Sequence, residues 1–441
     1  MRNIMLCLLL LCSYAFVFSC QPIQEDLTDS TSGNADGTTT EIIDDSGPDS
    51  SRPSNTEKVN HSDSEQLDDQ NGDELNTDAD LPDNIQIEAL ADTKKEAIQP
   101  WTGLQIVLFT PSDVAPPPSY RIRMKEVVDY TEAFFSKWMK HWGYPVDHPM
   151  KFHRDKEGFP IVWEVRGDKT QASGAYSQLG YAKTEVIPKA QKKYGIPTAN
   201  QFWWIFSYPG PDSRAYRGSG SHKLGIGNAN FVVVSGTLQV SDHLTEGVAE
   251  AFLLKATIHE MVHGLGLPHL GPMESDNLGN SLMGPTNKGY KKQFPLEKRV
   301  YLTKTAAAWL WKHPLMAGTF NDIQKTPTVK VSNLSTTYDS KLSKIVVSGK
   351  LISDLKAHSV VVINTSKNDP SEYWAKSFVG KVDNSGNFVC DVKELAKAGG
   401  ELKILFCFEN GAIMGKNGPV FGLRSALKKQ YNYSNGTYSF K

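Results

Sequence analysis

Three histidines and one glutamate lie within eleven residues, in the order His259, Glu260, His263 and His269. A helix has about 3.6 residues per turn, so His259 and His263 share one face, with Glu260 beside them. Gly266 then ends the helix, because glycine adopts the left-handed turn at a helix terminus, and the chain can bring His269 back to the first two histidines. Three convergent imidazoles with a neighbouring carboxylate predict a zinc site in a hydrolase.

A buried helix whose histidines form only local hydrogen bonds is the structural alternative. The full pattern argues against it, because HExxH alone recurs by chance whereas Gly266 and His269 add two further constraints. The pattern HExxHxxGxxH resembles the signature of the metzincin clan of zinc metallopeptidases. Met283, in the segment Asn280-Ser-Leu-Met-Gly, resembles the Met-turn of that clan, and Met273 is the weaker candidate for this position.

This resemblance implies one catalytic Zn²⁺ ion, with His259, His263 and His269 as ligands, Met283 beneath the ion and Glu260 as general base. Neutral imidazoles leave a fourth position for water, as catalytic zinc sites require. Zinc lowers the pKa of that water and polarises the scissile carbonyl, while Glu260 takes the proton and passes it to the leaving amine. We therefore expect a zinc metalloendopeptidase that acts on protein or peptide substrates.

The residues next to the motif differ from those of the named metzincin families. Leu270 follows the third histidine, where adamalysin-like enzymes usually have Asp and matrixins usually have Ser. Gly284-Pro285 follow Met283, where astacin-like enzymes have a tyrosine two residues on. The resemblance therefore extends to the clan and to no single family. Tyr290 is a candidate to reach the metal or an oxyanion, and packing is its alternative role.

The first twenty residues have the zones of a secretory signal and end like a bacterial lipobox. Arg2 precedes an apolar run from Ile4 to Phe18, and Cys20 follows. The lipobox resemblance implies removal of a signal peptide, residues 1–19, and acylation of Cys20, typically with palmitate. Gln24-Glu25-Asp26 resembles the acidic export signal of surface lipoproteins in Bacteroidetes-like bacteria. We expect a lipid-anchored, surface-exposed protein of the bacterial outer membrane, with cleavage elsewhere or an uncleaved anchor as alternatives.

An acidic segment, residues 20–98, separates the predicted anchor from the rest of the chain. Its residues 21–98 hold 21 acidic and 4 basic side chains, a net charge of −17, and almost no aromatics. Such a composition cannot bury enough apolar surface to offset the entropy of ordering, so we expect a disordered tether. Because Arg2 adds +1 and the chain total is −2, residues 99–441 carry +14. That positive charge favours anionic substrates or glycans, or attraction of the folded part to the acidic tether. We expect no nucleic-acid partner.

Residues 99–322 have the pattern of an α/β domain, which we identify with the catalytic domain. The expected strands and helices are Leu104–Phe109, Tyr120–Trp142, Phe159–Val165, Lys183–Tyr194, Phe202–Ser207 and Phe231–Ser235, followed by a zinc helix from Ser241 or Asp242 and a closing helix, Leu296–Trp311. Their order resembles the metzincin catalytic domain, a mixed twisted sheet with an active-site helix. The glycine-rich segment Gly218–Gly227 is either an edge strand that pairs with substrate or a mobile surface loop.

Residues 326–441 consist of repeated short apolar runs separated by Gly, Asn, Asp and Ser. About seven such runs predict an all-β, immunoglobulin-like sandwich. We expect it to bind a glycan or another surface ligand, with structural support as the alternative role. Cys390 and Cys407 lie in this part. The sequence allows two alternatives for them, a disulfide bond or two buried free thiols.

A second class of function is a surface adhesin or glycan-binding lipoprotein with a non-catalytic zinc site. Glu260 argues for catalysis, because a structural zinc has no use for a general base and fills its fourth position with protein. A gluzincin-type peptidase with a downstream ligand such as Glu274 is a third hypothesis, and His269 at the metzincin spacing argues against it.

Overall fold

The computed structural model describes residues 104–117, 120–177, 179–198, 201–210, 218–221, 223–228, 252–297, 299–317, 325–369 and 371–441. Four predicted features lie outside these residues: the signal peptide with Cys20, the acidic tether, the strand Phe231–Ser235 and the start of the zinc helix at Ser241 or Asp242.

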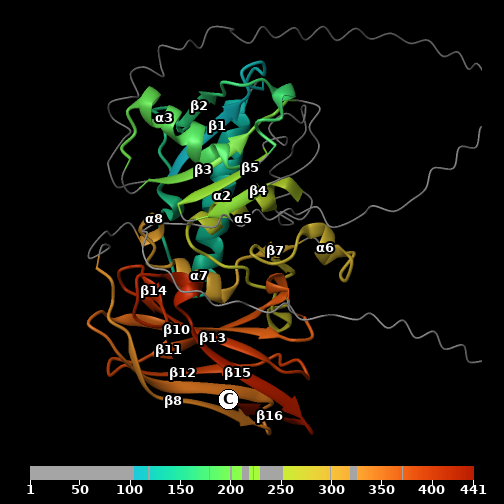
Figure 1. Cartoon of the computed structure of the whole chain (residues 1–441), viewed down its shortest axis with the longest axis vertical. Helices are drawn as coiled ribbons and strands as arrows, with labels where there is room; N and C mark the ends of the chain where they lie inside the picture. Colours follow the sequence, from blue (N-terminus) through green and yellow to red (C-terminus); the bar gives the residue numbers. More distant parts are fainter. Residues whose placement is uncertain are drawn as a thin grey trace, which may run out of the picture. The chain divides into compact units, whose positions relative to one another are not determined.

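A mixed sheet with strand order β2-β1-β3-β5-β4 organises the α/β region (Figure 1). Strands β1 (Leu104–Thr110), β2 (Val162–Arg166), β3 (Phe202–Ser207) and β5 (Leu224–Asn228) are parallel, and β4 (Gly218–Ser221) pairs with β5 in the antiparallel direction. Every residue of β1 is buried, as expected for a parallel strand that is covered on both faces. The predicted mixed α/β fold is therefore confirmed.

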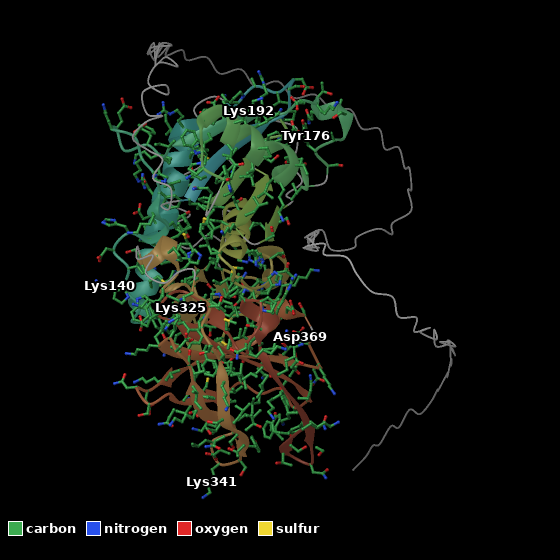
Figure 2. All side chains as sticks on the ribbon, turned by 60° about the vertical axis from the view of Figure 1, so that its left-hand side comes forward. Lys140, Tyr176, Lys192, Lys325, Lys341 and Asp369 are labelled. Atoms are coloured by element: carbon green, nitrogen blue, oxygen red, sulfur yellow. The ribbon has the colours of Figure 1, made fainter. Side chains whose placement is uncertain are left out.

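Helices cover both faces of this sheet. On one face, Ile106 and Leu108 share a core with α2 (Tyr120–His141) and α5 (Phe252–Gly264). On the other, Val107 and Phe109 pack with α3 (Ile187–Tyr194) and the π-helical turn η3 (Ala182–Val186) that precedes it. Tyr176, labelled in Figure 2, packs edge-on against Phe109 on this second face, with ring centroids 4.9 Å apart. The alternation of residues along β1 thus divides the α/β region into two cores.

The chain between α5 and the β region forms short elements. They are η5 (Glu274–Asp276), β6 (Asn280–Ser281), α6 (Asn287–Lys291), β7 (Val300–Tyr301), α7 (Lys304–Leu310) and α8 (Pro314–Ala317). The predicted helix Leu296–Trp311 is wrong in its first half: Leu296 is 91% exposed, and α7 begins after Thr303. The Thr303 hydroxyl accepts a hydrogen bond from Ala306 N, so it caps a helix that cannot extend further back.

The β region contains β8 (Lys330–Asp339), β9 (Lys344–Ile352), β10 (Ala357–Ser366), β11 (Lys376–Val382), β12 (Asn387–Val392), β13 (Gly400–Phe408), β14 (Ile413–Met414), β15 (Leu427–Ser434) and β16 (Thr437–Phe440). They form one sheet of order β16-β15-β13-β10-β11-β12-β9-β8, with β14 beside β13. The rings of Tyr338 in β8 and Tyr438 in β16 lie 4.8 Å apart, so the two edge strands meet. Figure 2 labels Lys341 at the turn between β8 and β9.

This single barrel-like sheet differs from the predicted immunoglobulin-like sandwich, in which two separate sheets face each other. The apolar pattern predicted strands correctly, but the same alternation suits either arrangement, because it does not specify which strands pair. One face of β10 and β13, with Val360 and Phe406, points into the core of the barrel. The opposite face, with Val361 and Leu405, joins the core of the α/β region.

The α/β region and the β region therefore share a hydrophobic core, which also contains Trp309 and Ala307 of α7. The predicted boundary between residues 99–322 and 326–441 falls near residues 318–324, outside the described part of the chain, and it stays a prediction.

The remaining short turns are η1 (Pro149–Lys151), η2 (Gln171–Ser173), η6 (Glu372–Trp374) and η7 (Gly422–Ser425). Among the helices that the structure describes, none has the length and apolarity needed to cross a lipid bilayer.

Cys390 and Cys407 are buried free thiols. Cys390 belongs to the core of the barrel and Cys407 to the core shared with the α/β region, so the two side chains lie on opposite faces of the sheet. Burial raises the pKa of the Cys390 thiol to about 12.

Candidate metal centre

Helix α5 lies directly against strands β4 and β5, and glycines make this close approach possible. A Cβ atom at Gly220 would lie 2.1 Å from His263 Cβ, and one at Gly225 would lie 2.4 Å from Met261 Cα. On the helix side, a Cβ at Gly264 would meet the backbone of Leu224 at 2.9 Å. The glycine-rich segment thus forms the edge strand β4 and its neighbour β5, and contact with the helix requires glycine at positions 220 and 225.

The helix ends where the sequence predicted. Its last residue is Gly264, Gly266 has a φ of 87°, and Gly266 N donates a hydrogen bond to His263 O over 2.9 Å. Only glycine adopts this left-handed conformation without strain. The turn reverses the chain and returns His269 to the face of α5 that carries His259.

The three histidines converge through their Nε2 atoms. His263 Nε2 lies 3.0 Å from His259 Nε2 and 3.1 Å from His269 Nε2. In the described residues, the ligand atoms of these three histidines lie within 4.8 Å of one another, which is close enough to hold a metal ion. The sequence motif therefore assembles in space as a three-nitrogen cluster.

Backbone carbonyls set the orientation of the two helical histidines. His259 Nδ1 lies 2.9 Å from Leu282 O, and His263 Nδ1 lies 2.7 Å from Leu267 O. Because a carbonyl oxygen only accepts, each Nδ1 carries the proton and donates, which leaves the Nε2 lone pair directed toward the other rings. This is the tautomer in which histidine binds a metal through Nε2.

The environment keeps these imidazoles neutral. Burial, followed by the neighbouring imidazole charges, lowers the pKa of His259 well below its usual value and that of His269 to about 3. Burial also lowers the pKa of His263. Neutral rings cannot relieve the mutual repulsion of their lone pairs by sharing protons, whereas a cation between them can.

A zinc ion fits this donor set. Tetrahedral zinc with Zn–N bonds of about 2.0–2.1 Å separates its nitrogen ligands by about 3.3 Å. The observed separations of 3.0 and 3.1 Å are within a few tenths of an ångström of that value. The three histidines would hold the ion and leave its fourth position open, as in catalytic zinc sites.

Glu260 follows His259 on the same helix and is 8% exposed. The candidate general base is therefore largely buried and adjoins a member of the triad in the chain.

The loop that contains Met283 is tied to both ends of the motif. Leu282 O accepts the His259 hydrogen bond, and Met283 O accepts one from Leu270 N over 3.1 Å. Met283 is 1% exposed and belongs to the same core as α5. Met273 is instead directed to the β region, where its Sδ accepts from Ser377 N over 3.5 Å.

Lys255 is a site residue outside the predicted zinc motif. It is 3% exposed, and its Nζ donates to Pro285 O over 2.8 Å and to Gly284 O over 3.3 Å. The available signal was a lysine on the apolar zinc helix, one turn before His259. Its ammonium group ties α5 to the loop that follows Met283.

Tyr373 is a second site residue outside the motif, and it comes from η6 in the β region. Its ring centroid lies 3.9 Å from that of His269 and 6.2 Å from that of His259. No local signal marks this tyrosine, because its place beside the motif depends on how the β region packs.

Two alternatives from the sequence do not join the triad. Tyr290 is 7% exposed and stacks on Phe294 and Trp374, with centroid distances of 4.7 and 5.9 Å, which is a packing role. Glu274 lies outside the triad, and its carboxylate is 3.5 Å from Lys376 Nζ.

Comparison with known proteins identifies the fold. No protein-family model matches the sequence, and no curated protein matches it. Two crystal structures of wild type OgpA from Akkermansia muciniphila align with TM-scores of 0.59 and 0.58 at 19% and 18% identity. They cover 78% of this chain and 96% and 97% of OgpA. The chain shares its fold with OgpA.

A third structure is catalytic inactive OgpA in complex with an O-glycopeptide substrate, glycodrosocin. It aligns with a TM-score of 0.57 at 20% identity and covers 78% of this chain and 97% of OgpA. Because the alignment spans nearly all of OgpA, the α/β region and the β region together correspond to the OgpA fold.

Proposed function

We propose that the chain is a zinc-dependent endopeptidase of metzincin type that cleaves O-glycosylated peptides or proteins. The observation that carries the proposal is the convergence of three neutral histidines through their Nε2 atoms, 3.0 and 3.1 Å apart, beside the buried Glu260 on the same helix. A structural zinc site has no use for such a carboxylate.

When bound, zinc supplies Lewis acidity, which polarises a carbonyl and lowers the pKa of water. The protein side chains supply the rest. His259, His263 and His269 hold the ion, and Met283 supports the cluster from the core. Glu260 takes the proton of the attacking water and delivers it to the leaving amine.

Strand β4 favours a peptide as the substrate. In the described part of the chain it is one of the two edge strands of the five-stranded sheet, the one on the side of α5, and Gly220 within it contacts the helix at His263. An extended peptide that pairs with β4 adds main-chain hydrogen bonds along the sheet and runs past the histidine cluster. Such pairing accepts any side chain, so selectivity comes from other contacts.

The substrate class is drawn from the OgpA complex. The fold that binds an O-glycopeptide substrate in OgpA is the fold of this chain over 78% of its length. We infer that this chain also acts on O-glycosylated peptides and that the β region contributes contacts to the glycan or to a surface ligand.

We further propose that the chain works at the surface of a bacterial outer membrane, anchored through acylated Cys20. The tether, residues 21–98, would give the folded part a typical reach of about 50 Å from the membrane, as a flexible chain of that length has. Metabolic labelling with a palmitate analogue tests the anchor: wild type should carry the label and Cys20→Ser should not.

The test of the peptidase function compares wild type with Glu260→Ala on one peptide in O-glycosylated and unglycosylated forms, with mass spectrometry of the products. Both proteins should bind one zinc ion, and only wild type should cleave the glycosylated peptide. Glu157→Ala, in an exposed turn, is the matched control and should behave as wild type.

The outcomes separate the parts of the proposal. Equal cleavage of both peptides by wild type would remove the O-glycan requirement and leave the endopeptidase. If wild type binds zinc and cleaves neither these peptides nor an unstructured protein, the endopeptidase proposal fails and a surface adhesin with a non-catalytic zinc site replaces it.

A further inference from the structure

The three metal-binding histidines are held in different ways. His259 and His263 belong to α5, and a backbone carbonyl fixes each Nδ1. His269 belongs to the segment beyond the helix, where the chain has no regular secondary structure. Its position therefore depends on contacts with the rest of the molecule.

The β region supplies one of these contacts through Tyr373. The Tyr373 ring lies 3.9 Å from the His269 ring at an interplanar angle of 32°, and 6.2 Å from the His259 ring at 21°. An aromatic ring at this distance covers one face of His269 and limits its rotation about the side-chain bonds.

The segment that follows His269 is attached to the same part of the β region. Gly271 N donates to Ala375 O over 2.8 Å, and Lys376 Nζ donates to Pro272 O over 2.8 Å. A Cβ at Gly271 would lie 2.5 Å from the Trp374 backbone, so the two chains are in direct contact.

A second group of hydrogen bonds holds the next turn, η5. The Glu394 carboxylate accepts from Glu274 N over 3.1 Å and from Ser275 N over 2.9 Å. Lys376 Nζ lies 3.2 Å from this carboxylate and links it to the Pro272 contact. Hydrogen bonds to charged groups are among the stronger ones, so the segment is fixed at several points.

We propose that Tyr373 is a positioning residue for the third metal ligand, His269, and that the β region is thereby a working part of the metal centre. The proposal deepens the function above, since it rests on His269 binding the metal. It assigns to the β region a role in building the site, in addition to any contact with a glycan.

The test measures zinc affinity of the full-length chain by competition with a chromophoric chelator. Tyr373→Ala removes the ring, and we expect the Kd for zinc to rise 10- to 100-fold, the range found when groups that orient metal ligands are removed. Tyr373→Phe keeps the ring and should stay within threefold of wild type. Tyr433→Ala removes a comparable, partly buried tyrosine elsewhere in the β region and should also leave the affinity unchanged.

Cobalt substitution gives a second readout that general loss of packing would not change. The visible absorption bands of bound Co²⁺ report ligand geometry, so they should shift in Tyr373→Ala and stay in place in Tyr373→Phe and Tyr433→Ala. Lys376→Met removes the hydrogen bond to Pro272 O and should weaken zinc binding at least threefold. This variant keeps the proposal testable if Tyr373→Ala does not fold.

Wild-type zinc affinity in both Tyr373→Ala and Lys376→Met would overturn the proposal. Equal losses in Tyr373→Phe and Tyr373→Ala would also overturn it, because the hydroxyl and not the stacked ring would then be responsible. Neither readout requires peptide cleavage, so a failure of the peptidase function leaves this test intact.

Discussion

The contact between α5 and β5 predicts a specific sensitivity to a single methyl group at Gly225. A Cβ there would lie 2.4 Å from Met261 Cα and 2.5 Å from Glu260 O, and both are backbone atoms that cannot rotate away. Carbon atoms in contact lie about 3.5–4.0 Å apart, so Gly225→Ala forces the helix back by about 1 Å. An overpacking cost of about 2 kcal/mol corresponds to a fall in Tm of about 3 °C, because the unfolding entropy grows with chain length and the folded part spans residues 104–441.

The same displacement reaches the metal centre. Helix α5 carries His259 and His263, whereas His269 is attached to the β region, so retreat of the helix separates the ligands. A misplacement of about 1 Å costs on the order of 100-fold in catalysis. Thermal melting and kcat/KM would be compared with Gly180→Ala, where an added Cβ meets nothing within 4 Å. If both variants melt and cleave like wild type, the close packing of helix and sheet is refuted.

Two further predictions concern groups around the triad. Lys255→Met removes the donor to Gly284 O and Pro285 O, so urea denaturation should show a loss of about 1–3 kcal/mol. An unchanged free energy of unfolding would contradict that anchoring role. In the metal-free chain, the pKa of His269 is about 3 when folded and about 6.5 when unfolded. Between these values the unfolded chain binds more protons, so stability should fall as the pH drops from about 6.5 toward 3. In urea titrations, His269→Gln should reduce the pH dependence of the free energy of unfolding. An equally steep pH dependence in that variant would contradict its attribution to His269.

The metal cluster was predictable from sequence because most of it is local. Two of the three histidines share one helical face, and Gly266 brings the third back within a few residues, so their spacing is enough to predict the cluster. The strand from Leu104 and the helix from Tyr120 were predictable for the same reason, since periodic burial is a local pattern.

Nonlocal packing explains what the sequence did not reveal. Tyr373 and Lys376 reach the site only because the β region packs against the loop after His269, and no local pattern encodes that contact. The barrel-like closure of β8 on β16 depends on which strands lie next to each other, and the alternation of apolar and polar residues along a strand does not specify that. The helix expected from Leu296 failed because apolar spacing continued across Thr303, the residue that caps α7.

The central claim is that the histidine triad holds a zinc ion on which peptide cleavage depends. The most direct measurement is cleavage of an O-glycosylated peptide by the full-length chain before chelation, after removal of metal with 1,10-phenanthroline and after return of zinc. We predict that chelation abolishes cleavage and that one equivalent of zinc restores it, with no restoration in His269→Ala. Undiminished cleavage by the chelated chain would contradict the claim.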